Sequence, residues 1–352
     1  MPSLICIISP AKSLAAHSNM LLPVTRSVPI FLQKTHKLVE LLRDMRASEF
    51  KKLMSISDTI AQRTYEEYQN FQISESITSL GTSSFMQAGL LFDGPAYRGL
   101  CCAALSPEEM NTCQQSVRFL SGLYGLLRAG DLIQNHRLEM GTTFKGLSLP
   151  SNAKTLYEYW ASTIAENITT TLKPNNTGAY VGMLLNCASE EYFKVIDTAA
   201  IAASGCQIVT CVFTDKGKVV SVYAKRARGL MARFVSTNAK LLAAMRAAEA
   251  AGGNREGKLL LLSALQEFSL EGYVFKHMSE DKNGMITLYY DRAGAAPVQP
   301  VHEISRGSAA AVAGQELVAE QQNADSKSEL GMRGLQQASD ASQSKAKRSR
   351  KT

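Results

Sequence analysis

The sequence predicts a mixed α/β fold of the α+β type, in one domain over residues 1–291 followed by a disordered basic tail over residues 292–352. Helical and strand patterns alternate along the first part of the chain without a regular βαβ repeat. The chain has 352 residues and is 45% hydrophobic, enough to build a sizeable core. After Asp291 the composition shifts to Ala, Gln, Ser and Gly with almost no aromatics, too little apolar surface to offset chain entropy.

The first half of the domain contains one buried strand and several helices. Residues 4–8 are a short apolar run, which indicates a central strand. Apolar residues at helical spacing predict a helix over 28–46, and a Ser-Asp start predicts another over 57–71. Residues 106–120 begin with a capping Ser, a Pro and two acids, a strong helix start. A further helix is expected over 152–171.

The second half is richer in strands. Strands are expected over 180–185, 207–213 and 219–224, the last two flanking the hairpin turn Asp215-Lys216-Gly217. A long helix begins at Lys225. The remaining elements are an Ala-rich insertion over about 237–260 and a closing hairpin formed by 273–276 and 285–290.

Composition excludes several function classes. No window approaches the roughly 18 consecutive apolar residues of a membrane span, and the N-terminal apolar run lacks the basic start of a signal peptide. The 7 cysteines are odd in number and scattered, which indicates free buried thiols in a reducing compartment. The 5 histidines do not pair as ligands, so no metal and no cofactor is expected.

The net charge of +7 does not by itself establish a polyanion partner. Residues 292–352 hold 9 basic and 6 acidic side chains, which leaves 29 basic and 25 acidic side chains, a net +4, for the domain. The last residues, Lys345–Lys351, are a dense basic run. This run fits a nuclear import signal or a nucleic-acid tether, and it also fits a merely solvated tail.

Polar residues follow several predicted strand ends, where α/β folds place ligand contacts. They could bind a nucleotide or other anionic small molecule, with Glu139 as a base or hydrogen-bond acceptor. Each also has a structural interpretation: a solvated Lys, a surface ion pair, or a helix cap. The candidates are Ser9, Lys12, Arg137, Glu139, Asn186 and Ser189.

The helix KRARGLMARFV carries a basic face opposite an apolar one. Gly229 and Ala232 lie within that basic face, where small residues would let a phosphate backbone approach. From Asp215 to Arg233 the local net charge is +5. A solvated basic face is the alternative. The cations of this region are Lys216, Lys218, Lys225, Arg226, Arg228 and Arg233.

The segment LSGLYGLLR places Gly122 and Gly125 around two apolar residues after a predicted helix. One interpretation is a helix-hairpin-helix, whose backbone N–H groups contact DNA phosphates with Arg128 in support. The alternative, which the residues alone favour, is a Gly helix cap followed by a strand.

Five segments in this order, ISPAKSL, LSGLYGLLR, DLIQNHRLEMG, N-x-ASEEYFK and YAKRARGLMARF, resemble the YaaA family of peroxide stress resistance proteins. FDGPAYRGL and FSLEGYVF are similar to two further segments of that family. The resemblance covers about 290 residues. It implies a cytoplasmic protein with no established enzymatic activity that limits damage from unincorporated iron. It also implies non-sequence-specific binding of double-stranded or branched DNA through a helix-hairpin-helix in a basic cleft.

The chain departs from the family pattern in places. Asn135-His136 stand where Pro-Tyr is usual, Cys187 replaces a Leu, and the tail has no counterpart. Because the resemblance implies it, DNA binding is the leading hypothesis, and an enzyme acting on an anionic small molecule is the alternative. No membrane association is expected, and any effect on iron is expected to be indirect. The expected DNA contacts are Gly122, Gly125, Arg128, Lys216, Lys218, Lys225, Arg226, Arg228 and Arg233.

Overall fold

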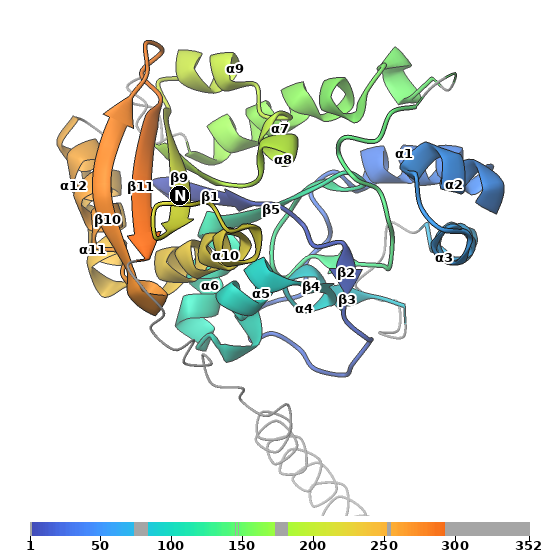
Figure 1. Ribbon diagram of the computed structural model, residues 1–352, viewed down its shortest axis with the longest axis horizontal. Coiled ribbons are helices and arrows are strands. Elements are labelled where there is room, and N and C mark those ends of the chain that lie inside the picture. The colour runs from blue at the N-terminus through green and yellow to red at the C-terminus, as the bar shows by residue number, and fades with distance from the viewer. Residues whose placement is uncertain are drawn as a thin grey trace, which may run out of the picture. The chain divides into compact units, whose positions relative to one another are not determined.

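The computed structural model describes residues 2–73, 84–144, 146, 148–172, 182–251 and 255–292. These residues form a seven-stranded sheet in the order β10-β11-β9-β8-β1-β5-β6 (Figure 1). Strands β11, β9, β8, β1 and β5 run parallel, and β10 and β6 are antiparallel at the two edges. The strands are β1 (Leu4–Ile8), β5 (Val117–Ser121), β6 (Gly125–Leu127), β8 (Met183–Cys187), β9 (Gln207–Asp215), β10 (Tyr273–Glu280) and β11 (Ile286–Arg292).

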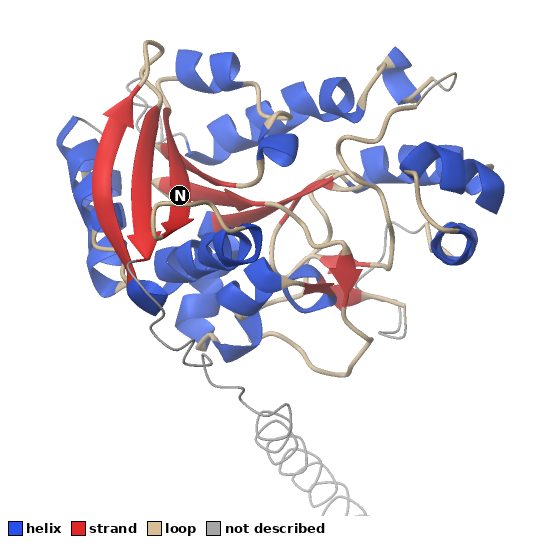
Figure 2. Ribbon diagram, in the orientation of Figure 1, coloured by secondary structure: helices blue, strands red, loops and turns tan. Residues whose placement is uncertain are grey.

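Helices cover both faces of this sheet (Figure 2). One face packs against α6 (Pro107–Ser116) and α10 (Ser221–Thr237), and the other against α7 (Leu156–Leu172) and α9 (Thr198–Ala203). Two small two-stranded sheets lie apart: β2 (Ser13–Leu14) with β4 (Phe92–Asp93), and β3 (Met86–Gln87) with β7 (Leu132–Ile133). The other helices are α1 (Leu32–Arg43), α2 (Ala47–Met54), α3 (Asp58–Gln69), α4 (Ala88–Leu91), α5 (Pro95–Leu100), α8 (Glu190–Phe193), α11 (Ala239–Ala250) and α12 (Arg255–Gln266).

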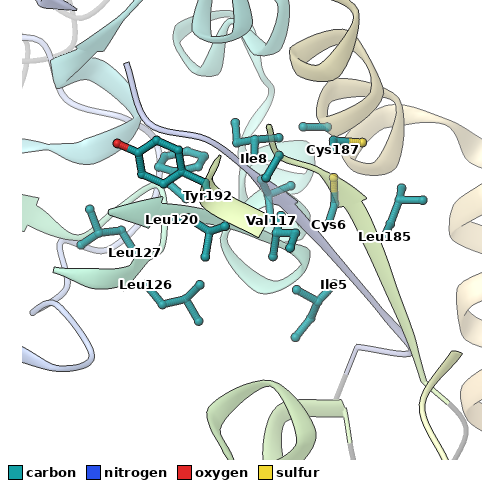
Figure 3. Packing of buried hydrophobic residues seen from close by; sticks show 14 of the residues in the cluster. Ile5, Cys6, Ile8, Val117, Leu120, Leu126, Leu127, Leu185, Cys187 and Tyr192 are labelled. Carbon is teal, nitrogen blue, oxygen red and sulfur yellow. The ribbon is translucent and has the colours of Figure 1, made fainter. Parts of the chain in front are cut away.

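The core is centred on β1, whose five residues are completely buried. Figure 3 shows Ile5, Cys6 and Ile8 packed among side chains of β5, β6 and β8. A strand buried on both faces must be apolar throughout, which explains the unbroken run LICII. The mixed α/β class and the central strand are therefore confirmed.

Several predicted helices are confirmed in place. Ser57 caps α3 through Ile60 N, and Ser106 forms a capping box with Glu109 at the start of α6. The closing hairpin is also confirmed, as β10 and β11. The segment predicted as an Ala-rich insertion, about residues 237–260, contains α11 and the first half of α12, with Asn238 as the cap of α11.

The helix expected over 106–120 is too long. It ends at Ser116, and residues 117–121 form β5, which pairs in parallel with β1. Helical capping signals mark the start of an element, whereas this end is decided by pairing with a strand about 110 residues earlier.

The strand expected over 219–224 is wrong. The chain does turn at Asp215, with Gly217 at φ 75°, but α10 begins at Ser221. A hairpin partner would need a free edge of β9, and both edges are occupied, by β8 and β11. The tail was expected to begin at residue 292, but Arg292 is the buried last residue of β11 and pairs with Asp215 at 2.7 Å. The chain divides into units of residues 1–298 and 299–352, and residues 293–352 lie outside the described residues.

Candidate functional site

Ser9 and Ser189 meet at the carboxyl ends of the neighbouring strands β1 and β8. The backbone N–H of Ser189 donates to Ser9 Oγ over 2.8 Å, and the two hydroxyl oxygens lie 3.1 Å apart. Asn186 shapes the connecting loop, because its Oδ1 accepts from the N–H of Ala188 at 2.9 Å and its Nδ2 donates to Thr210 at 3.3 Å. Parallel strands bring these residues, 180 positions apart, to one edge of the sheet.

Lys12, Arg137 and Glu139 form a second group, which the chain connects to the first because Lys12 follows Ser9 by three residues. Glu139 shares its carboxylate between two cations: Oε2 lies 2.8 Å from Lys12 Nζ and Oε1 lies 2.9 Å from Arg137 Nη2. The Lys12 side chain is 65% exposed, whereas Arg137 and Glu139 are 23% and 28% exposed. Two further carboxylates lie near this group: Glu67 interacts electrostatically with Arg137, and Glu191 accepts from the backbone N–H of Gly141.

Neighbouring residues hold this site in place, and sequence reasoning missed their part in it. The Tyr97 hydroxyl donates to the backbone oxygen of Ser9 at 3.1 Å, and burial raises the pKa of Tyr97, so it remains a neutral donor. Glu191 accepts from the N–H of Gly141 at 3.2 Å and its backbone oxygen accepts from Tyr157 at 3.0 Å. Tyr97 lies in FDGPAYRGL and Glu191 in NCASEEYFK, so both motifs carried the signal.

The arginines of α10 are not all turned outward, contrary to expectation. Arg226 makes a bidentate ion pair with Glu271, from Nη2 at 2.6 Å and from Nε at 2.9 Å, and both side chains are mostly buried. Arg233 donates to the backbone oxygens of Leu100 and Cys101 at 3.0 and 3.2 Å. These two guanidinium groups are therefore already occupied within the protein.

The small residues on the basic face of α10 serve helix packing and not phosphate approach. A Cβ added to Gly229 would lie 1.7 Å from the backbone oxygen of Ala96 in α5. A Cβ added to Gly99 of α5 would lie 2.5 Å from the backbone oxygen of Arg226. The two glycines let the backbones of α5 and α10 touch, so this face of α10 is covered.

The segment from Gly122 to Gly125 is a buried β-hairpin turn between β5 and β6, not a helix-hairpin-helix. The backbone oxygen of Gly122 accepts from Trp160 Nε1 at 2.9 Å. Gly125 has φ 69° and lies against the Trp160 ring. The backbone N–H groups of this buried turn are therefore not presented to solvent. Arg128 pairs at 2.9 Å with Asp131, which is fully buried.

The remaining cations of the expected DNA surface lie near the carboxyl end of β9. Lys216, Lys218 and Lys225 are exposed. Arg228 is half-buried beside Cys187 and Cys211, and burial lowers its pKa. Of the nine expected contacts, only these four present a cation that makes no ion pair or hydrogen bond with the described residues.

Among the described residues, no helix combines the length and apolar character needed to cross a membrane. The same part of the chain contains no group of three or more His, Cys, Asp or Glu side chains placed to hold a metal ion.

Comparison with known proteins gives a consistent family. Residues 4–252 match the family model described as peroxide stress protein YaaA. A UPF0246 protein of Burkholderia vietnamiensis is 38% identical over 276 residues, covering 77% of this chain and 93% of the relative. A UPF0246 protein of Burkholderia thailandensis is 35% identical over 296 residues, covering 83% of this chain and all of the relative.

Proposed function

Because this chain belongs to the YaaA family of peroxide stress proteins, we propose that it acts in peroxide stress by binding an anionic ligand. The ligand would bind at the strand-end site, which consists of Ser9, Lys12, Arg137, Glu139, Asn186 and Ser189. The ligand class is a nucleotide or another small molecule that carries a phosphate or carboxylate. The observations that carry this proposal are the contact of Lys12 with Glu139, across 127 positions, and the contact of Ser9 with Ser189, across 180 positions.

The chemistry of these side chains suits an anion. Lys12 offers a mobile ammonium group, and Arg137 offers a fixed planar guanidinium that can bind two oxygens at once. Glu139 holds the two cations at a set separation because it pairs with both of them. An arriving phosphate can take over their hydrogen bonds, and the hydroxyl groups of Ser9 and Ser189 can donate to its remaining oxygens. The proposed activity is binding, and no reaction is assigned.

Ligand-dependent stabilisation of the full chain tests this proposal. Thermal shift and calorimetric titration would use a panel of nucleotides, inorganic phosphate and dicarboxylates. Lys12→Met and Arg137→Met should each weaken binding by about 10- to 100-fold, since each removes a charge-assisted hydrogen bond. Lys51→Met is the matched control, because Lys51 is an exposed lysine paired with Asp58 away from the site. The proposal is contradicted if both site variants bind as tightly as the original chain, or if no member of the panel binds.

DNA binding without sequence specificity is the second candidate, and three exposed lysines near the end of β9 favour it. As the resemblance implies, it would limit damage from unincorporated iron by protecting DNA. Lys216, Lys218 and Lys225 lie within ten residues and present positive charge to solvent. Phosphate neutralisation by such groups gives an affinity that falls steeply with salt.

A salt titration of duplex and junction DNA binding tests the second candidate. Replacing the three lysines by glutamine should reduce the slope of log affinity against log salt by about 2.7, at about 0.9 per phosphate contact. Arg226→Gln should leave the slope unchanged, because its guanidinium is paired with Glu271. Binding that is absent, or that ignores salt, rules this candidate out.

A cytoplasmic location is part of the proposal and is supported by seven free cysteines. The alternative is nuclear import through residues 345–351. A fluorescent fusion of the full chain, compared with one truncated before residue 345, distinguishes the two. Nuclear signal that is lost on truncation would favour the alternative.

A further inference from the structure

Three thiols gather on one face of the sheet, beneath α10. Cys6 lies on β1, Cys187 on β8 and Cys211 on β9, and all three are buried. The register pairs Ile8 with Cys187, and pairs Asn186 with Thr210. Side chains alternate along a strand, so Cys6, Cys187 and Cys211 point to the same side. Figure 3 shows the sulfur atoms of Cys6 and Cys187 on that side.

The register also decides which thiols can bond. Continuing the pairing of Asn186 with Thr210 by one residue places Cys187 directly opposite Cys211. Neighbouring strands lie about 4.8 Å apart, within the Cα separation of about 4.4–6.8 Å that a disulfide accepts. Cys6 instead lies opposite Leu185, two residues away from Cys187 along the strand, so its Cα is about 8 Å from that of Cys187, too far for a disulfide.

A positive charge faces the pair from α10. The thiolate is the reactive form of a cysteine, and a nearby cation lowers the pKa of the thiol. Burial raises the pKa of Cys187, but hydrogen bonds from Cys211 and Cys6 and the charge of Arg228 together lower it below that of a free thiol. Burial and the hydrogen bond with Cys187 raise the pKa of Cys211, and the hydrogen bond with Cys187 and burial raise the pKa of Cys6, so Cys187 is the most acidic of the three thiols.

We propose that Cys187 and Cys211 are a peroxide-reactive thiol pair, with Cys187 as the nucleophile and Cys211 as the resolving thiol. The Cys187 thiolate attacks one oxygen of hydrogen peroxide, the O–O bond breaks, and hydroxide leaves. The thiol of Cys211 then attacks the sulfenic sulfur, the S–S bond forms, and water leaves with the remaining proton. One peroxide and two thiols give one disulfide and two waters.

The location of the pair links it to the strand-end site. Cys187 is the last residue of β8 and is followed by Ala188 and Ser189. Oxidation of Cys187 would therefore pull on the loop that holds Ser189 against Ser9. The thiol chemistry depends only on the pair and Arg228, and it does not require the proposed anionic ligand.

Peroxide treatment of the reduced full chain tests the pair. After one to ten equivalents of hydrogen peroxide, denaturation and alkylation should modify five of the seven cysteines, with a mass 2 Da below the reduced chain before labelling. Peptide mapping should find Cys187 linked to Cys211. Arg228→Gln should slow the reaction about tenfold, because it removes the charge that stabilises the thiolate.

Two cysteine variants provide the matched comparison. Cys211→Ser should give no disulfide and leave a sulfenic acid on Cys187 that dimedone traps, whereas Cys6→Ser should still form the Cys187–Cys211 disulfide. If a variant does not fold, peptide mapping of the peroxide-treated original chain still shows whether Cys187 and Cys211 are linked. Seven alkylated cysteines after peroxide, or a disulfide between Cys102 and Cys113 in place of the expected one, overturns the proposal. Loss of ligand binding with intact thiol chemistry would count against the anionic-ligand function alone.

Discussion

Gly229→Ala separates the two interpretations of the basic face of α10. Replacing a glycine by alanine inside a helix normally stabilises it by about 1 kcal/mol. Here the new Cβ would lie 1.7 Å from the backbone oxygen of Ala96 and 2.5 Å from its carbonyl carbon. Both atoms are backbone, so α5 would have to retreat by about 2 Å to reach ordinary contact distance.

We therefore expect Gly229→Ala to be destabilising on balance. Overpacking costs about 1–3 kcal/mol, and this contact, which requires a backbone shift, belongs at the upper end. Against the gain in helix propensity, the free energy of unfolding should fall by about 2 kcal/mol. The measurement is urea unfolding followed by circular dichroism and by tryptophan fluorescence, since Trp160 is the single tryptophan.

The control is Lys225→Ala on the exposed side of the same helix, expected to change stability by less than about 0.5 kcal/mol. A Gly229→Ala protein that is as stable as the original, or about 1 kcal/mol more stable, would refute the reasoning. It would mean that this face of α10 is open, and therefore free to meet a phosphate backbone.

Three further outcomes are expected. Glu271→Gln should lower the free energy of unfolding, measured in denaturant, by about 3 kcal/mol, because it leaves the buried guanidinium of Arg226 without its ion pair. Glu267→Gln, which removes an exposed ion pair, should lower it by less than about 1 kcal/mol. Equal effects of the two changes would contradict this. Burial lowers the pKa of His136 to about 4, so the unfolded chain binds a proton between pH 6.5 and 4 that the folded chain does not. Stability should thus be full above about pH 6.5 and fall by about 3 kcal/mol toward pH 4, and His136→Gln should remove that part of the loss, as denaturant titrations at several pH values would show. Glu139→Gln should raise the affinity for a phosphate-bearing ligand roughly tenfold in calorimetry, because a competing negative charge is lost, and weaker binding would mean that Glu139 contacts the ligand itself.

The predicted helices and strands were confirmed where the sequence pattern that predicts them lies within the element itself. Ser106 at the start of α6 and Ser57 at the start of α3 satisfy backbone N–H groups within their own turn, so a few residues suffice to identify them. The apolar run of β1 likewise required a position buried on both faces. The errors occurred where a distant partner decided, as when β11 occupied the edge of β9 that residues 219–224 would have needed.

The candidate site divides in the same way. Each of its polar residues was identified from its position after a predicted strand, but the contact between Lys12 and Glu139 depends on how strands far apart in sequence are ordered. The basic face of α10 was identified from the spacing of its Lys and Arg residues along the helix. Whether those charges are available to a ligand was not visible, because Glu271 lies 45 residues later in the chain.

By itself, the sequence determined the mixed α/β class, the family and the chemical nature of the side chains at each strand end, because periodicity, capping and motif order are properties of short segments. The tertiary structure alone decided which cations are free, which glycines are packing contacts, and which thiols face each other. Those properties follow from the register of the sheet and from the close approach of α5 to α10. A local pattern fixes the direction of a side chain, and only packing fixes its partner.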